Sequence, residues 1–196
     1  LNQEDPALAE FSRAFYDRGA AEDLVAYTAE ELTGFARDAW QDFQNHELGT
    51  HRVSIADPAF KAQGSKVKGV SIIEIVNDNM PFLVDSLSSE MNRRGLTVHL
   101  IVHPILKVKR DSKGRLVRIM DAGEPEDGAR MESWMHVEVD EETPDGERDI
   151  EQGVLKVLED VRASVEDWRP MRERMGQVID DFRQTAEADR HQGEHD

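Results

Sequence analysis

The spacing of hydrophobic residues changes period twice in the middle of the chain, and this feature most constrains the fold. Val70–Val76 is rich in β-branched residues, which favours a strand. The hydrophobic residues of 83–91 then recur at helical spacing, and Gly95 is suited to the left-handed position that ends a helix. From Leu96 every second residue is hydrophobic, which is the period of a strand with one buried face. The sequence therefore predicts a strand, a polar connection, a short helix and a second strand in close succession.

The flanking segments extend this order. The first third of the chain has helical spacing, with a capping-box pattern at Thr28-x-x-Glu31. "DSKG" predicts a hairpin, "ESWMHVEVD" alternates like a further strand, and residues 150–168 carry a helical stripe that Pro170 is expected to break or kink. The predicted fold class is α+β, an antiparallel sheet with helices on one face, an N-terminal helical segment and a C-terminal helical extension. The predicted boundaries are 1–56 for the N-terminal segment, 57–168 for the α+β domain and 169–196 for the C-terminal helix and polar tail.

Composition excludes several classes of partner. Lys and Arg number 24 against 41 Asp and Glu, so the formal net charge is −17. The densest basic stretch, "KVKRDSKGR", reads as a hairpin, so nucleic acid and anionic membranes are poor partners. The absence of cysteine removes disulfides, thiol nucleophiles and cysteine-bound zinc. No stretch approaches the roughly 18 apolar residues of a spanning helix, and a cytoplasmic location is expected.

Catalytic signatures are missing from the sequence. There is no GxGxxG after a strand, no GxSxG and no Walker lysine, so no catalytic residue is predicted in this chain. His99, His103 and His136 could project from one sheet face near Glu74 and Glu138. Such spacing permits a zinc site without requiring one. Polar residues on an open face or at a subunit contact are the favoured interpretation, and no metal ligand is predicted.

The order and spacing of six segments resemble a known family. These segments are "HELGTHRVSI", "NDNMPFLVDSL", "NRRG", "LTVHLIVHPILKVKRDSKG", "ESWMHVEVD" and "LEDVRASVEDWRPM". They resemble the N-terminal region of the large bacterial NAD-specific glutamate dehydrogenases. The resemblance implies a βαββαβ domain of the ACT-like type that precedes the catalytic core. It also implies a large, oligomeric, cytoplasmic parent enzyme that oxidatively deaminates L-glutamate to 2-oxoglutarate and ammonia. NAD would be the cofactor of that parent, and no cofactor is predicted in this chain.

The polar connection after the first strand is the candidate effector site. ACT-like domains often bind an amino acid in the loop between the first strand and the first helix. A helix N-terminus favours a carboxylate, and Asp78 and Asp85 could hold an ammonium group. The candidate effector-binding residues are Asn77, Asp78, Asn79, Met80, Pro81, Phe82, Asp85 and Ser86. In the alternative interpretation, Asp78 and Asn79 only cap the helix.

One residue departs from the ACT-like pattern. That pattern usually has a glycine after the proline, whereas this chain has Phe82 after Pro81. The bulky ring could fill or close the ligand pocket. If it did, the domain would serve assembly and not effector binding.

An aromatic residue among polar ones on a sheet face suggests a subunit interface. The candidate interface residues are His99, Ile101, Trp134 and His136. In the alternative interpretation, the N-terminal helices cover this face with Phe11, Phe15, Trp40 and Phe43.

These observations favour a non-catalytic, amino-acid-sensing regulatory region, with a small amino-acid effector, the rest of the parent polypeptide and further copies of the chain as expected partners. The alternative is a purely structural assembly module that binds no effector. A third hypothesis is a small metalloenzyme that uses His99, His136 and Glu138.

Overall fold

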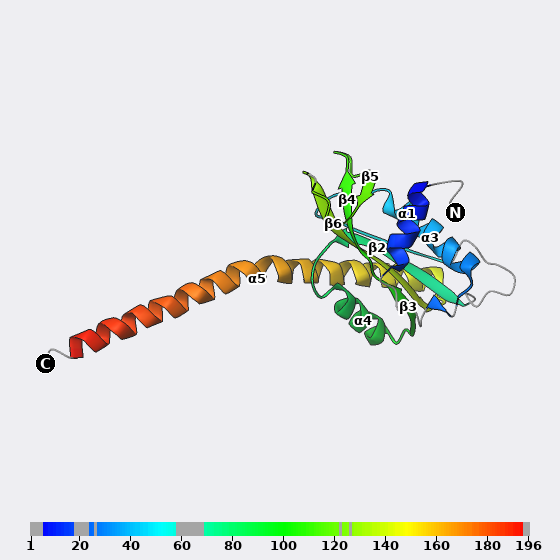
Figure 1. The fold of residues 1–196 in the computed structure, drawn as a ribbon. Coiled ribbons are helices and arrows are strands. Elements are labelled where there is room, and N and C mark those ends of the chain that lie inside the picture. Colours follow the sequence, from blue (N-terminus) through cyan, green and yellow to red (C-terminus); the bar gives the residue numbers. More distant parts are fainter. Residues whose placement is uncertain are drawn as a thin grey trace. The chain divides into compact units, whose positions relative to one another are not determined.

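The structure is a computed structural model that describes residues 6–17, 24–25, 27–57, 69–121, 123–125 and 127–193. The chain divides into two compact units, Leu1–Leu158 and Glu159–Asp196. The first unit contains the whole sheet, three complete helices and the beginning of the last helix (Figure 1). The second unit consists of the later part of the last helix. Within the described ranges no helix combines the length and the hydrophobicity that crossing a bilayer requires.

A curled antiparallel sheet forms the centre of the first unit. Its strands are β1 (His51–Ala56), β2 (Val70–Asp78), β3 (Val98–Val102), β4 (Ile105–Arg110), β5 (Leu116–Met120) and β6 (Ala129–Asp140). The order is β1-β2-β6-β4-β5, and β3 also pairs with β6. The long β6 pairs with β2 along one edge, while β3 and β4 share its other edge. The predicted strands and the hairpin between β4 and β5 are confirmed.

Four helices are described, and each carries local signals from the sequence. Their bounds are α1 (Pro6–Tyr16), α3 (Ala29–Phe43), α4 (Leu83–Arg94) and α5 (Pro144–Gly193). The capping box is present, because the Thr28 side chain accepts from the Glu31 N–H and the Glu31 carboxylate accepts from the Thr28 N–H. Gly95 ends α4 in the left-handed conformation with a φ of 77°. Of the predicted break or kink at Pro170, the break is wrong, because α5 continues through this residue, and the kink stays a prediction.

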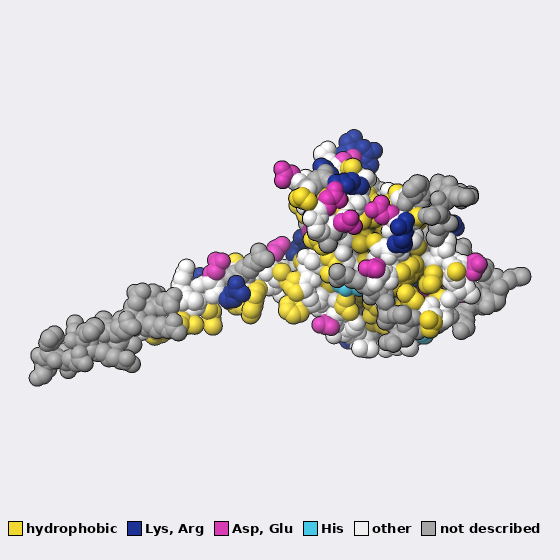
Figure 2. Space-filling view, in the orientation of Figure 1, with side chains coloured by type: hydrophobic (Ala, Val, Ile, Leu, Met, Phe, Trp, Pro, Cys, Tyr) yellow, Lys and Arg dark blue, Asp and Glu magenta, His cyan; other side chains and the backbone are white. Residues whose placement is uncertain are grey.

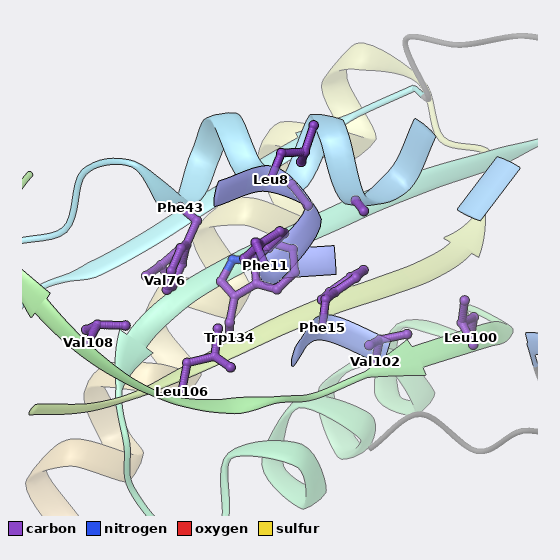
Figure 3. Packing of buried hydrophobic residues seen from close by; sticks show 12 residues of the cluster. Leu8, Phe11, Phe15, Phe43, Val76, Leu100, Val102, Leu106, Val108 and Trp134 are labelled. Carbon is purple, nitrogen blue, oxygen red and sulfur yellow. The ribbon is translucent and has the colours of Figure 1, made fainter. Parts of the chain in front are cut away.

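Helices cover both faces of the sheet, whereas the sequence predicted helices on one face. Figure 3 shows α1 and α3 over the face that carries Trp134, with α4 and the part of α5 that belongs to the first unit behind the sheet. The first face packs aromatic side chains of the helices onto strand residues. The core there contains Leu8, Phe11, Phe15, Ala36, Ala39, Phe43, Val76, Leu100, Val102, Leu106, Val108 and Trp134. The N-terminal helical segment is therefore built into the core of the domain.

A buried ionic cluster ties α3 to the β4–β5 hairpin and to β6. The fully buried Glu132 accepts hydrogen bonds from Arg110 Nε at 2.8 Å and Arg110 Nη2 at 2.7 Å. It also accepts from Arg130 Nε at 2.5 Å, and His46 Nδ1 lies 3.1 Å away. Arg110 Nη2 donates in addition to the Phe43 carbonyl at 2.9 Å. Glu132 therefore anchors three elements that are far apart in the sequence.

Candidate functional site

The first residues of the polar connection are bound to neighbouring strands and loops. Asn77 is buried, and its Oδ1 lies 2.7 Å from His51 Nδ1. Asp78 Oδ2 accepts a hydrogen bond from the Gly49 N–H at 2.8 Å. The backbone N–H of Asn79 donates to the Met131 carbonyl at 3.2 Å. The connection is thus held by β1, β6 and the residues before β1.

Neither Asp78 nor Asn79 caps the following helix, so that alternative is wrong. The N-cap of α4 is Phe82, and no side chain provides a capping hydrogen bond there. Asp85 lies in the first turn, where a negative charge is favoured by the helix dipole. The Ser86 N–H donates to the Phe82 carbonyl at 3.0 Å. The first N–H groups of this 12-residue helix therefore point towards the connection without a side-chain cap.

A cleft of about 560 Å³ lies beside the connection and reaches it at Asn79. It is bounded by α1 and by β4, β5 and β6. Arg13 and Lys107 bring positive charge to its wall, and the Lys107 ammonium donates to the Glu124 carbonyl at 2.5 Å. Its carboxylates come from Glu10, Asp17 and Asp121. The cleft therefore presents charges of both signs together with an apolar lining, which includes Ile105, Ile119 and Met131.

The four predicted interface residues do not form one surface. Trp134 and His136 are 0% and 1% exposed, because α1 and α3 cover them. The Trp134 ring lies 4.5 Å from the Phe15 ring and 5.3 Å from the Phe11 ring, centre to centre. The interface prediction for Trp134 and His136 is therefore corrected in favour of cover by the N-terminal helices.

The remaining two interface residues lie on β3. His99 is exposed and its Nε2 lies 2.9 Å from Asp140 Oδ1. Ile101 is half-buried and pairs with Val137, on the opposite sheet face from Trp134. The interface prediction for His99 and Ile101 stays a prediction.

The comparisons with known proteins agree with this architecture. A family model described as "Glutamate dehydrogenase, ACT1 domain" matches residues 11–154. The chain belongs to this glutamate dehydrogenase ACT1 family. The NAD-specific glutamate dehydrogenase of Halomonas elongata is 34% identical over 179 residues, which are 91% of this chain and 11% of that protein. The enzyme of the same name from Pseudomonas aeruginosa is 29% identical over 175 residues, or 89% of this chain and 11% of the relative. No solved structure matches.

Phe82, which stands where the ACT-like pattern usually has glycine, has an unusual backbone conformation. Its φ of 70° is the one positive value at a non-glycine residue in the described ranges. Phe82 is 66% exposed, so its side chain does not fill a buried pocket, and closure of the ligand site by Phe82 stays a prediction. The left-handed conformation is the one that glycine adopts without cost. Phe82 therefore keeps the backbone geometry suited to the glycine of the ACT-like pattern, while its side chain points into solvent.

His136 lies near Glu74 and Glu138 as the sequence suggested, but the cluster is buried inside the ACT1 domain and not on an open face. His136 Nδ1 lies 2.7 Å from Glu74 Oε1, and His136 Nε2 lies 3.4 Å from Glu138 Oε1. Tyr27 donates its hydroxyl to Glu138 Oε2 at 2.7 Å. Burial opposes the charge on His136, but Glu74 and Glu138 outweigh this and raise its pKa to about 9. Burial also raises the pKa of Glu74 to about 7, although His136 pulls it down.

The three histidines considered as metal ligands have separate partners. His136 lies between two carboxylates, His99 is next to Asp140, and His103 Nε2 lies 2.6 Å from Ser133 Oγ. In the part of the chain that the structure describes, no group of three His, Asp or Glu residues is arranged to hold a metal ion. The predicted shared face holds for Glu74, His136 and Glu138, whereas His99 lies at a register shift of β3 between Val98 and Leu100.

Proposed function

We propose that this ACT1 domain is the N-terminal regulatory region of an NAD-specific glutamate dehydrogenase and that it senses a free amino acid. The parent enzyme would oxidise L-glutamate with NAD in the cytoplasm, using a catalytic core outside this chain. The chain spans 11% of the length of each of the two relatives, which leaves most of the parent polypeptide for catalysis.

The observation that carries this proposal is the cleft beside the connection. An amino acid carries a carboxylate and an ammonium group. Arg13 and Lys107 supply positive charge for the first, while Glu10, Asp17 and Asp121 supply negative charge for the second. Asn79 places the connection at the wall of the same cleft. Regulation requires the effector to bind two packings of the region with different affinities.

A thermal-shift screen against the amino acids and 2-oxoglutarate tests the proposal. A ligand at about 100 times its Kd stabilises the folded state by about 2.7 kcal/mol. For a unit of this size, that raises the melting midpoint by about 5–10 °C. Arg13→Gln and Asn79→Ala should abolish the shift, while Lys113→Gln, which removes an exposed cation outside this cleft, should retain it. No shift with any amino acid would reject the sensing role.

A second candidate function is assembly of the parent enzyme, and the second unit supports it. Five large side chains in this part of α5 are 47–73% exposed and recur at spacings of three and four residues. They are Trp168, Met171, Met175, Val178 and Phe182. Figure 2 shows hydrophobic atoms along this stretch. Such heptad spacing is typical of a helix that pairs with another helix.

The partner we propose for this stripe is a second copy of the same chain. In a parallel pair, Asp167 of one copy would face Arg172 of the other from the positions that flank the stripe, and their charges are complementary. Light scattering after size exclusion should show a concentration-dependent dimer. Met175→Glu should make the chain monomeric, and Val117→Glu, which alters an exposed apolar residue on β5, should not. A monomer at every concentration would reject this pairing.

A further inference from the structure

One oxygen of a buried carboxylate has no hydrogen-bond partner. Glu74 lies on β2 and is 7% exposed. Its Oε1 is 2.7 Å from His136 Nδ1, whereas its Oε2 is buried without a partner among the described residues. A buried carboxylate oxygen that lacks a donor costs free energy. Such an atom in a native structure therefore points to a donor from outside the described contacts.

Glu74 lines a cavity of about 200 Å³ between α3 and the strands β1 and β2. This cavity is separate from the cleft at Asn79 and shares no lining residue with it. Phe35 and Ile72 give it apolar walls, and Ser54 and Gln41 add neutral polar groups. Its volume fits a small molecule of a few heavy atoms.

The charge of the cavity wall has one sign. Asp38, Asp42 and Asp57 line it together with Glu74, and the described lining residues include no lysine or arginine. Asp42 accepts hydrogen bonds from Arg52 Nη2 at 2.8 Å and from Ser54 Oγ at 2.5 Å. Asp38 and Asp42 add to the effect of burial in raising the pKa of Glu74. The cavity therefore attracts a cation and repels an anion.

We propose that this cavity binds a small ammonium cation, which donates a hydrogen bond to Glu74 Oε2. An ammonium N–H needs one acceptor for each bond, whereas Ca²⁺ takes six to eight oxygens. The ring of Phe35 in the wall suits a cation of this kind. The α-carboxylate of a free amino acid would meet Asp38 and Asp57, so this site differs in ligand class from the sensing cleft.

Two sources share this chemistry, namely the ammonium ion itself and the amine of a small organic molecule. Titration of the 196-residue chain with ammonium, methylammonium and butylammonium chloride at constant ionic strength separates them. Tetramethylammonium chloride, which has no N–H donor, and sodium chloride are the controls. Tighter binding with increasing alkyl length would identify an organic amine, and binding of ammonium alone would identify the free ion.

Backbone amide shifts in NMR spectra locate the binding. The amides of Ser54, Ala56 and Ile72 should shift with saturation, and those of Ile119 and Met131 in the other cleft should not. Glutamate should not shift the first group, so a failure of this proposal and a failure of amino-acid sensing are distinguishable. Equal effects of sodium and ammonium, or shifts outside the cavity, would overturn the ammonium site.

Variants test the role of the carboxylates. Glu74→Gln and Asp38→Asn should each weaken ammonium binding tenfold or more, which corresponds to about 1.4 kcal/mol. Asp38 is half-buried, so Asp38→Asn keeps the test valid if Glu74→Gln fails to fold. Glu124→Gln, which removes a carboxylate that lines neither cavity, should bind ammonium like the unaltered chain. Unchanged affinity in Asp38→Asn would overturn the proposal.

Protonation of Glu74 should compete with the cation. The groups that face Glu74 are His136 from β6, Asp38 and Asp42 from α3, and Tyr16 from α1. Since the pKa of Glu74 is raised to about 7, ammonium should bind more tightly at about pH 8 than at about pH 6. Affinity that does not change between these values would contradict a direct bond to Glu74.

Discussion

Replacing Glu132 by glutamine should destabilise the first unit more than any change to a surface ion pair. Glu132 is the acceptor for Arg110 and Arg130, with His46 beside it, and both Glu132 and Arg110 are 3% exposed or less. Burial alone would raise the pKa of Glu132, but hydrogen bonds from His46 and Arg110 outweigh it and lower the pKa to about 2. Compared with the ordinary value of 4.5, this difference corresponds to about 3 kcal/mol.

The variant also leaves a buried guanidinium without its counter-charge. Breaking a buried ion pair by removing one partner costs about 3–5 kcal/mol. The melting midpoint of Glu132→Gln should therefore fall by about 6–12 °C or more. Urea unfolding followed by circular dichroism at neutral pH measures the free energy directly, and the slope against urea should not change.

A surface pair provides the control. Glu124 binds Arg118 at 2.6 Å, but the two side chains are 38% and 44% exposed. Glu124→Gln should cost less than about 1 kcal/mol. If Glu132→Gln lowers the free energy of unfolding no more than Glu124→Gln does, the role assigned to the buried cluster is refuted.

The pH dependence gives an independent test of the same group. A carboxyl with a lowered folded pKa stabilises above its unfolded pKa and loses this contribution as pH falls through the folded value. The difference in the free energy of unfolding between the unaltered chain and Glu132→Gln should have its full value above about pH 4.5 and should shrink as pH approaches about 2. A difference that stays constant over this range would show that Glu132 acts through packing alone.

Two further variants test other parts of the domain. Thr28→Ala should cost about 1 kcal/mol, because it removes the acceptor of the capping box at α3, and thermal unfolding would measure the loss. Stability should also fall as pH rises from about 6.5 to about 9, because the folded pKa of His136 is raised and its charged form is lost over that window. His136→Gln should flatten the pH profile, and an unchanged profile would contradict the charge assigned to His136.

Local signals in the sequence predicted most elements of the fold. The Thr28 and Glu31 pair, the glycine at 95 and the alternation of residues 132–140 each act within one element, so their physical consequence does not depend on the rest of the chain. The faces of the sheet could not be assigned in this way. Alternation shows that a strand has two faces, but both faces of β6 are buried in the fold.

Buried charges were the least predictable feature, because their partners are distant in the sequence. His136 meets Glu74 across 62 residues, and Arg130 meets the His46 carbonyl across 84. Polar residues in a strand normally indicate exposure, so His136 and Glu138 were expected outside. The chain instead buries them with opposite charges, which is the condition under which charged groups are tolerated in a core.

Phe82 shows how a backbone requirement can be hidden by a side chain, and one comparison of variants tests this explanation. Its φ of 70° disfavours any side chain, and its exposed ring contributes little burial. At an ordinary helical position, glycine is less stable than alanine by about 1 kcal/mol. At a positive φ the order should reverse, so Phe82→Gly should be more stable than Phe82→Ala by about 1 kcal/mol in urea unfolding. The sign of this difference tests whether residue 82 requires a positive φ. If the alanine variant is the more stable of the two, residue 82 does not need the glycine conformation of the ACT-like pattern.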